Sequence, residues 1–122
     1  MPNTVRALRG ATTVDEDTRE QVHERVGELL GALFERNGLG PDDLISVIFT
    51  ATDDISSAFP AEAARAFGLG AVPLLCAREL EVVGGTARCI RVLAHVEVGD
   101  GDRSLRHVYL EGAKGLRDDL PE

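Results

Sequence analysis

The segment Cys89–Val98 places the strongest constraint on the fold, because its residues alternate in chemical character. Every second residue from Ile90 to Val98 is apolar, whereas the positions between them include Arg91, His95 and Glu97. A period of two residues is typical of a β-strand that buries one face. The other face carries an arginine in mid-strand, so it is either solvated or closed against another subunit. The sequence therefore predicts a sheet with one covered face and one open face.

A long amphipathic helix provides the layer that covers the sheet. Its apolar positions follow the 3.6-residue period of an α-helix and form one stripe from Val22 to Phe34. Residues 13–16 and 17–20 both have the spacing of a helix-start signal. Asn37-Gly38 is a suitable stop, because glycine readily adopts the left-handed conformation that ends helices. Gly27 and Gly31 lie inside the helix and allow close approach of another backbone, or are merely tolerated.

The remaining elements define the fold class. Strands are expected at residues 4–12, Leu44–Ala51, 71–76 and 106–110, and the alanine-rich residues 60–67 are expected to form a short helix. Pro73 favours a place at the edge of the sheet, because proline cannot donate to the ladder. The element order predicts an α+β domain, with a single mixed sheet covered by one long and one short helix. A length of 122 residues fits one domain, residues 1–122.

Charge and composition exclude several classes of partner. The formal net charge is −8, so nucleic acid and anionic membrane surfaces are repelled on average. No apolar run approaches the roughly 20 residues of a membrane span, and the first residues lack the apolar region of a signal peptide. We therefore expect a cytoplasmic protein in which Cys76 and Cys89 are reduced thiols. The scattered histidines and cysteines lack the spacing of a metal site, so no metal is expected.

Arg91 is the first candidate for function that the residues themselves indicate. A guanidinium in mid-strand is either an exposed charge paired with a carboxylate or a hook for an anion. Arg9 and Tyr109, which project from other predicted strands, have the same two interpretations. Arginines and a tyrosine on neighbouring strands would suit a small dicarboxylate. Cys76 is expected to be an inert thiol rather than a nucleophile, because the nearby Glu79 disfavours a thiolate.

Several short strings carry a family resemblance when they are taken in their order and spacing. The chain resembles the AroH class of monofunctional chorismate mutases from about residue 5 to residue 120. The strings are RALRGATT at residues 6–13, FPA at 59–61, CARE at 76–79, GG at 84–85, CIRV at 89–92, RHVYLE at 106–111 and LR at 116–117. The resemblance implies a homotrimer whose sheets surround a central axis as a pseudo-barrel with the helices outside. It also places the active sites between adjacent subunits.

The implied reaction is the rearrangement of chorismate to prephenate, a concerted [3,3] shift that uses no cofactor and no metal. By the resemblance, Arg91 is the cation beside the ether oxygen, and Arg9 holds a substrate carboxylate and assists there. Tyr109 donates a hydrogen bond to a carboxylate. Glu79 accepts a hydrogen bond from the ring hydroxyl and faces the positive charge that develops on the ring. Cys76 lies near the same hydroxyl.

The resemblance also assigns the walls of the site. Phe59 and Ala61 correspond to residues that line the pocket from the neighbouring subunit. Leu116 and Arg117 correspond to a C-terminal segment that closes over the ligand, and Arg65 is expected near its mouth. Two positions depart from the family pattern. Glu62 stands where a lysine is expected near the entrance, and Leu75 replaces a common threonine and thereby removes one hydroxyl.

Two other functions fit the same residues. One is an imine or enamine deaminase, a class with a related trimeric sheet and an interfacial arginine, for which Arg106 or Arg117 would serve. The other is a non-catalytic trimeric module that binds carboxylates. Turnover of chorismate distinguishes the chorismate mutase from both. A further alternative is a trimer whose arginines only form ion pairs between subunits. In that case, loss of Arg91 would weaken the assembly of the trimer.

Overall fold

Five strands form one mixed sheet in the computed structural model, which describes residues 3–99 and 104–116. They are β1 (Thr4–Thr13), β2 (Leu44–Ala51), β3 (Leu74–Arg78), β4 (Cys89–Val98) and β5 (Val108–Tyr109). Their spatial order is β3-β2-β4-β1-β5. The central strand β4 runs antiparallel to both β1 and β2, whereas the edge strands β3 and β5 pair in parallel with their neighbours. The expected single mixed sheet is therefore confirmed.

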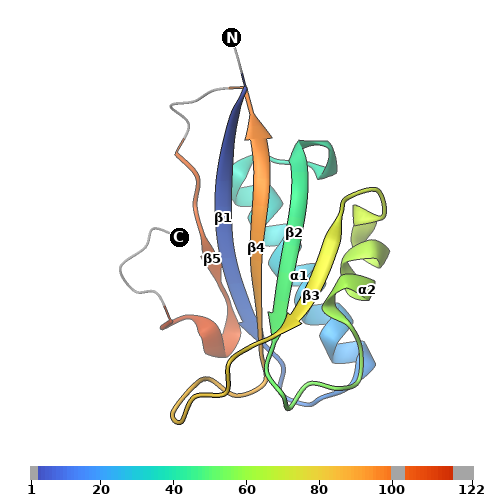
Figure 1. The fold of residues 1–122 in the computed structure, drawn as a ribbon, viewed down its shortest axis with the longest axis vertical. Helices are drawn as coiled ribbons and strands as arrows, with labels where there is room; N and C mark the ends of the chain where they lie inside the picture. The colour runs from blue at the N-terminus through green and yellow to red at the C-terminus, as the bar shows by residue number, and fades with distance from the viewer. Residues whose placement is uncertain (1–2, 100–103, 117–122) are drawn as a thin grey trace.

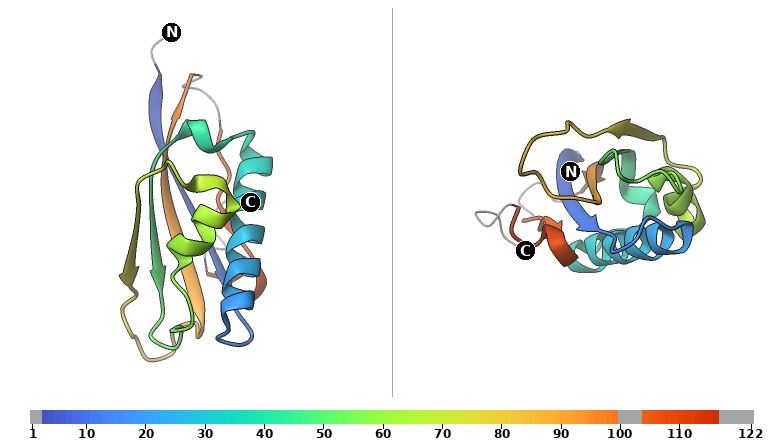
Figure 2. Two further views of the ribbon diagram at one scale, coloured as in Figure 1. Left: turned by 90° about the vertical axis from the view of Figure 1, so that its right-hand side faces the viewer. Right: turned by 90° about the horizontal axis from the view of Figure 1, so that it is seen from below.

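Both helices lie on one face of this sheet and leave the other face open (Figures 1 and 2). Helix α1 (Arg19–Asn37) packs across the strands. The shorter α2 (Pro60–Ala64) continues as a wider helical turn over Arg65–Leu69. The molecule thus has two layers, and the α+β class with one long and one short helix is confirmed. No helix in the described part of the chain combines the length and apolar character needed to cross a bilayer.

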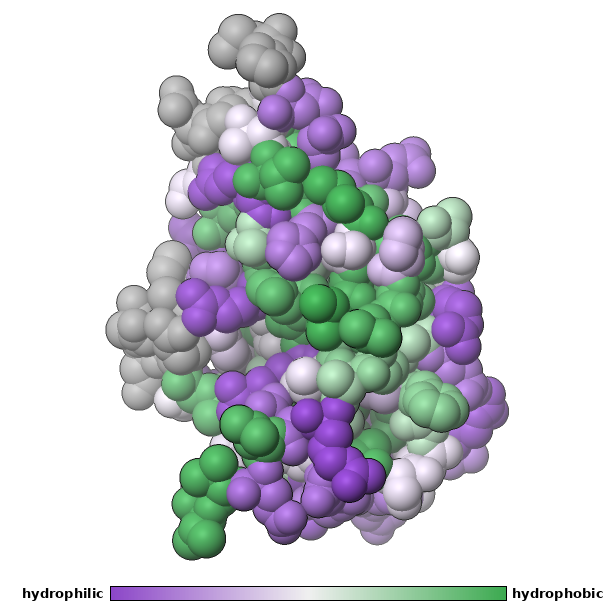
Figure 3. Space-filling view, viewed as in Figure 1, coloured by the Kyte–Doolittle hydropathy of each residue, from purple (hydrophilic) through white to green (hydrophobic). Residues whose placement is uncertain are grey.

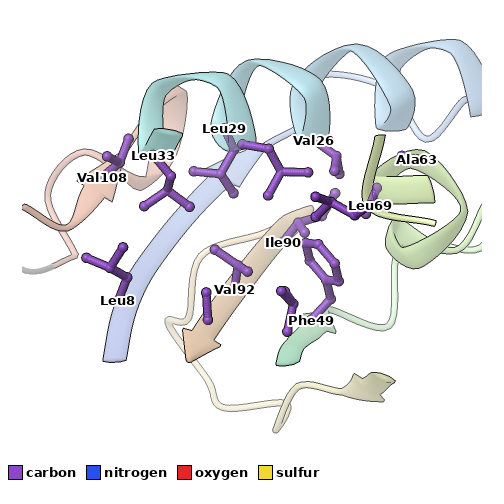
Figure 4. Packing of buried hydrophobic residues seen from close by; sticks show 14 of the residues in the cluster. Leu8, Val26, Leu29, Leu33, Phe49, Ala63, Leu69, Ile90, Val92 and Val108 are labelled. Carbon is purple, nitrogen blue, oxygen red and sulfur yellow. The ribbon is translucent and has the colours of Figure 1, made fainter. Parts of the chain in front are cut away.

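The main core fills the space between the helices and the sheet (Figure 4). The apolar stripe of α1 contributes Val26, Leu29 and Leu33, each no more than 2% exposed. The alternate residues Ile90 and Val92 of β4 meet them from the sheet. Full burial of such side chains contributes about 1.5–3 kcal/mol each. The two periodicities in the sequence therefore identify the two surfaces that form the core.

Helix α1 begins one residue later than the second start signal indicates. Thr18 is the N-cap, and its hydroxyl accepts a hydrogen bond from the Gln21 N–H at 3.1 Å. The Gln21 carboxamide oxygen accepts hydrogen bonds from the backbone N–H groups of Asp15 and Glu16. The functional motif is therefore residues 18–21, and the signal at residues 13–16 is not a helix start because Thr13 ends β1. The predicted stop is confirmed, since Gly38 has φ 61° and ψ 40°.

Two predicted strands differ from the observed ones. The strand expected at residues 71–76 is β3, which starts only after Pro73 and continues to Arg78 at the edge of the sheet. The expected strand at 106–110 shrinks to Val108–Tyr109, because β5 pairs only with Gly10 and Ala11 of β1. The segment before it is fixed by side chains instead. Asn37 at the end of α1 donates to the Arg106 carbonyl at 2.9 Å and accepts from the Arg106 N–H.

Gly10 is the point of closest approach between β1, β5 and α1, and we expect it to resist substitution. A Cβ atom there would lie 2.9 Å from the Val108 carbonyl oxygen and 3.1 Å from Leu29 Cδ1. Overpacking of this kind typically costs about 1–3 kcal/mol, so Gly10→Ala should lower the free energy of unfolding by that amount. Denaturant unfolding would measure the change. Gly27→Ala is the matched control: a Cβ there meets nothing within 4 Å, and alanine should stabilise the helix by about 0.5–1 kcal/mol.

Candidate active site

The uncovered face of the sheet has an apolar middle with hydrophilic residues above and below it (Figure 3). We call the end around Arg91, where β4 begins, the charged end. Val5 and Leu75 are 58% and 60% exposed, and Leu93 of the central strand is half-buried. Arg9 on β1 and Arg91 on β4 project from the same face, where they are diagonal neighbours: Arg9 is opposite Leu93, and Arg91 is opposite Ala11. A two-residue period thus places both predicted arginines on one surface.

Arg91 and Glu79 form the centre of the charged end. The Arg91 Nε atom lies 3.3 Å from Glu79 Oε2, and the two side chains are 45% and 26% exposed. Glu79 reaches this position because its backbone N–H donates to the Ala51 carbonyl at 3.0 Å, which extends the pairing of β3 with β2 beyond Arg78. The Thr50 hydroxyl also donates to Glu79 Oε2, at 2.6 Å. A hydrogen bond and an ion pair thus hold a single carboxylate oxygen.

Arg9 and Tyr109 complete a depression around this pair, which we call the arginine depression. Its volume is about 270 Å³, and both residues line it with Thr50, Glu79 and Arg91. Tyr109 is held in place because β5 pairs with β1 and the Arg9 N–H donates to His107 Nδ1 at 2.9 Å. Glu79 and Arg91 also border a larger, open hollow of about 570 Å³, which is lined in part by the loop that precedes β4. The structure therefore brings together the four residues to which the resemblance assigns the main roles.

Phe59 and Cys76 lie around a different depression, beside the edge strand β3. Its volume is about 470 Å³, and its walls include the loop before α2. Cys76 Sγ accepts a hydrogen bond from the Ala61 N–H at 3.4 Å, and Phe59 is 68% exposed. Cys76 is paired in register with Phe49, a core residue, and so is on the helix-covered side of the sheet. Within one chain, this group does not meet the depression of Arg91.

Glu62 in this second region is already paired. The Arg19 guanidinium of α1 donates to its carboxylate, and His23 Nε2 lies 3.4 Å from the same oxygen. The hydrogen bond from Arg19 holds the pKa of Glu62 below its usual value. The acidic residue in the position expected for lysine thus has a counter-charge on the neighbouring helix.

The other predicted residues are spread over the molecule. Leu75 is exposed on β3, next to Ile48 of β2, and Arg65 is exposed at the end of α2. Leu116 packs on a small second cluster formed by Ala11, Cys89, Tyr109 and Ala113. It therefore lies beside the tyrosine of the arginine depression. Arg117 is outside the described residues.

A buried arginine that the sequence analysis did not identify fixes the C-terminal segment. Arg25 is 8% exposed, and its guanidinium donates to the Thr13 carbonyl and pairs with Asp15 at 2.9 Å. It also lies 3.7 Å from the carboxylate of Glu111, which has a φ of 52°. Its position on the edge of the apolar stripe of α1 was the available signal. Arg25 joins the end of β1 to the turn that follows Tyr109.

The start of β4 depends on a second group that the sequence analysis did not identify. Asp54 accepts two hydrogen bonds from the Arg88 N–H, at 2.9 and 3.1 Å. Arg88 has a φ of 45°, which is strained for a residue with a side chain, and it immediately precedes β4. The Thr52 hydroxyl accepts from the Cys89 N–H at 3.0 Å and donates to Asp54. This network fixes the point from which β4 carries Arg91 into the site.

The same network sets the electrostatics beside Arg91. Burial alone would raise the pKa of Asp54, but hydrogen bonds from Thr52 and from the Arg88 backbone outweigh it and lower that pKa. Burial raises the pKa of the Cys89 thiol, against the opposing effect of the nearby Arg91 charge. Cys89 therefore stays a neutral thiol at physiological pH. Within residues 3–99 and 104–116, no three His, Cys, Asp or Glu side chains are grouped so that they could hold a metal ion.

The fold and the site together define a class of protein. A single mixed sheet carries two arginines, a carboxylate and a tyrosine on its open face, which is a surface suited to a small, multiply charged anion. The family description "Chorismate mutase type I" matches residues 5–120. The chain belongs to this family.

Individual relatives agree with this assignment. Chorismate mutase AroH of Thermus thermophilus is 51% identical over 117 residues, which cover 95% of this chain and 96% of the relative. Chorismate mutase AroH of Bacillus subtilis is 40% identical over 117 residues, covering 95% and 92%. The solved structure of a chorismate mutase from Clostridium thermocellum superimposes with a TM-score of 0.85 at 45% identity and covers 89% of this chain and 97% of that one.

The lowered pKa of Asp54 gives a prediction for stability against pH. A carboxylate whose pKa is lower in the folded protein than its ordinary value of 3.8 stabilises the fold above that value, and the contribution is lost as pH falls through the folded-state pKa. Asp54→Asn should therefore reduce the free energy of unfolding at pH 7 by about 0.5–1.5 kcal/mol, the usual contribution of a hydrogen bond. The difference from the wild type should shrink below pH 3.8.

Urea unfolding at a series of pH values would measure this difference. Asp42→Asn removes an exposed carboxylate without contact to Arg88 and is the control for net charge. An effect of Asp54→Asn that is equally large at low pH would contradict the assignment.

Proposed function

We propose that the arginine depression on the open sheet face carries out the activity of this family, the rearrangement of chorismate to prephenate. The observation that carries the proposal is the grouping of Arg91, Glu79, Arg9 and Tyr109 around one depression of about 270 Å³. Membership of the chorismate mutase type I family and two relatives named chorismate mutase support the activity itself. The enzyme is thus an isomerase.

Arg91 stabilises the charge that develops in the transition state. In a concerted [3,3] shift the ether C–O bond breaks ahead of C–C bond formation, so negative charge develops on the ether oxygen. A fixed guanidinium beside that oxygen stabilises the transition state more than the ground state, and this difference accelerates the reaction. Arg91 is suited to this role because its strand is the centre of the sheet and its Nε is already held by Glu79.

Arg9 and Tyr109 restrict the conformation of the substrate. The enolpyruvyl arm must fold over the ring before the C–C bond forms. Groups that bind the carboxylates hold the arm in this conformation and so lower the entropic cost of reaching the transition state. Arg9 and Tyr109 lie on adjacent strands, β1 and β5, and both side chains line the depression. Glu79 accepts a hydrogen bond from the ring hydroxyl and faces the ring, on which positive charge develops.

We place the complete site between subunits of a homotrimer with the sheets inside as a pseudo-barrel. Two observations support this arrangement. The open face exposes large apolar side chains, including Val5 and Leu75. Phe59 and Cys76 line a depression separate from that of Arg91 within one chain, and the Ala61 N–H donates to Cys76 Sγ. A neighbouring subunit would bring such a group across. The C-terminal residues Leu116 and Arg117 close the site in this proposal, with Arg65 at its mouth.

A cytoplasmic location belongs to the same proposal. Cys76 and Cys89 are both free thiols, as suits a reducing compartment. Chorismate and prephenate are the small-molecule partners, and the reaction as written requires no cofactor.

Purified protein should accelerate the loss of the ultraviolet absorbance of chorismate, with prephenate as the product. Arg91→Ala should lower kcat by at least about 10²–10³-fold, the usual effect of losing one preorganised donor to a developing oxyanion. Arg36→Ala, at the exposed end of α1, removes the same charge far from the sheet face and should keep full activity. The mass of each variant in solution should remain that of the trimer.

Three other results would each have a distinct meaning. A folded trimer that does not accelerate the loss of chorismate above its spontaneous rate would indicate a non-catalytic module that binds carboxylates. Activity on imines instead of chorismate would indicate the deaminase. Dissociation of Arg91→Ala into monomers would show that the arginine serves assembly.

Mixing two inactive variants tests whether sites are shared. Arg91→Ala and Phe59→Asp damage residues that the proposal places on opposite sides of one interface. At equal mixing during refolding, about one site in four should combine an intact Arg91 with an intact Phe59, so activity should return. Arg91→Ala mixed with Glu79→Ala, two variants from the same side, is the control. Equal recovery in both mixtures, or in neither, would contradict sites between subunits.

A further inference from the structure

Among residues 3–99 and 104–116, Thr50 is the one uncharged residue whose side chain donates a hydrogen bond to the charged pair of the site. It occupies β2 directly opposite Arg91 of β4, so both side chains project from the open face. Its hydroxyl donates to Glu79 Oε2 at 2.6 Å, the same oxygen that lies 3.3 Å from Arg91 Nε. Thr50 and Arg91 come from the neighbouring strands β2 and β4, Glu79 follows the end of β3, and all three line the depression of about 270 Å³.

We infer that Thr50 is a positioning residue that prevents Glu79 from neutralising Arg91. This inference rests on the proposed function. A carboxylate and a guanidinium on adjacent strands attract each other, and a fully closed bidentate pair would engage the guanidinium donors that the substrate needs. The threonine hydroxyl competes for the shared oxygen and anchors it on the β2 side. The carboxylate then stays beside Arg91 without closing over it.

The location of Thr50 makes this anchor rigid. The side chain is half-buried, and its backbone pairs with Arg91 on one side and with Ala77 of β3 on the other. A threonine has few accessible rotamers in a strand, so the sheet restricts the position of its hydroxyl oxygen. Glu79, in contrast, follows the end of β3 and is joined to β2 by one backbone hydrogen bond. Of the two partners, the carboxylate is therefore the one that needs to be held.

Removal of the hydroxyl should affect the transition state more than substrate binding. In Thr50→Val the shape of the side chain is kept, but Glu79 loses its competing donor and closes on Arg91. The positive potential at the ether oxygen then falls just where negative charge develops. We expect kcat to fall about tenfold, in line with the loss of a hydrogen bond to a charged group, with a smaller change in KM. Thr50→Ser keeps the hydroxyl and should retain most of the wild-type kcat.

A double-mutant cycle separates positioning from a structural effect. If Thr50 acts through Glu79, Thr50→Val should have little further effect on kcat in a Glu79→Ala background. Ser46→Ala removes a hydroxyl from the same strand and the same face, four residues from Thr50, and should leave kcat unchanged. Thermal unfolding and the mass in solution of all variants would show that each remains folded and assembled.

The outcomes distinguish this inference from the function on which it rests. An active wild type with a tenfold loss in Thr50→Val, rescue by serine and no further loss beside Glu79→Ala would support it. An active wild type with Thr50→Val unchanged, or with the same loss in both backgrounds, would overturn this inference alone. A wild type without any activity on chorismate would overturn the proposed function and this inference together.

Discussion

The antiparallel pairing of β4 with β1 on one side and β2 on the other is the constraint on which the rest of the structure depends. This register places Arg91 opposite Ala11 and opposite Thr50. A shift by one residue would turn the arginine into the core and the apolar residues Ile90 and Val92 out to the open face. The packing of α1 on that apolar set therefore secures the register. The energy of the core, although remote from the depression, decides which way the guanidinium points.

An acidic protein needs a local arrangement of charge to bind an anion. The net charge of −8 opposes the approach of a dianion at long range. Close to the site, however, three carboxylates are already engaged: Glu79 with Arg91 and Thr50, Asp53 with Arg78, and Asp54 with the Arg88 backbone. Glu62, near the second depression, is paired with Arg19. Screening at physiological salt limits the long-range term to about 8 Å, so the paired charges nearby have the greater influence.

Periodicity was sufficient to predict the sheet layer, the helix that covers it and the open face with Arg9 and Arg91, because burial on one side imposes a pattern on the sequence. It was not sufficient where single hydrogen bonds decide. The start of α1 at Thr18 depends on the Gln21 side chain, and the short β5 depends on Asn37, which holds the segment before it. The grouping of Glu79 with Arg91 came from the family resemblance, since two residues twelve positions apart, one after β3 and one in β4, leave no local pattern.

Thr50, Arg25 and Asp54 belong to a third kind of residue, one whose role depends on a contact distant in the sequence. The local sequence around each of them indicates no special role, because a threonine in a strand, an arginine on a helix and an aspartate in a loop are all common. Their partners are 29, 12 and 34 residues away, and Arg25 also faces Glu111 near the opposite end of the chain. Thr50 holds the side chain of Glu79 in the site, whereas Asp54 holds the residue before β4 and Arg25 holds the end of β1 and the turn after Tyr109. In a protein whose proposed reaction depends on a fixed charge rather than on proton transfer, such supports determine how well that charge is fixed.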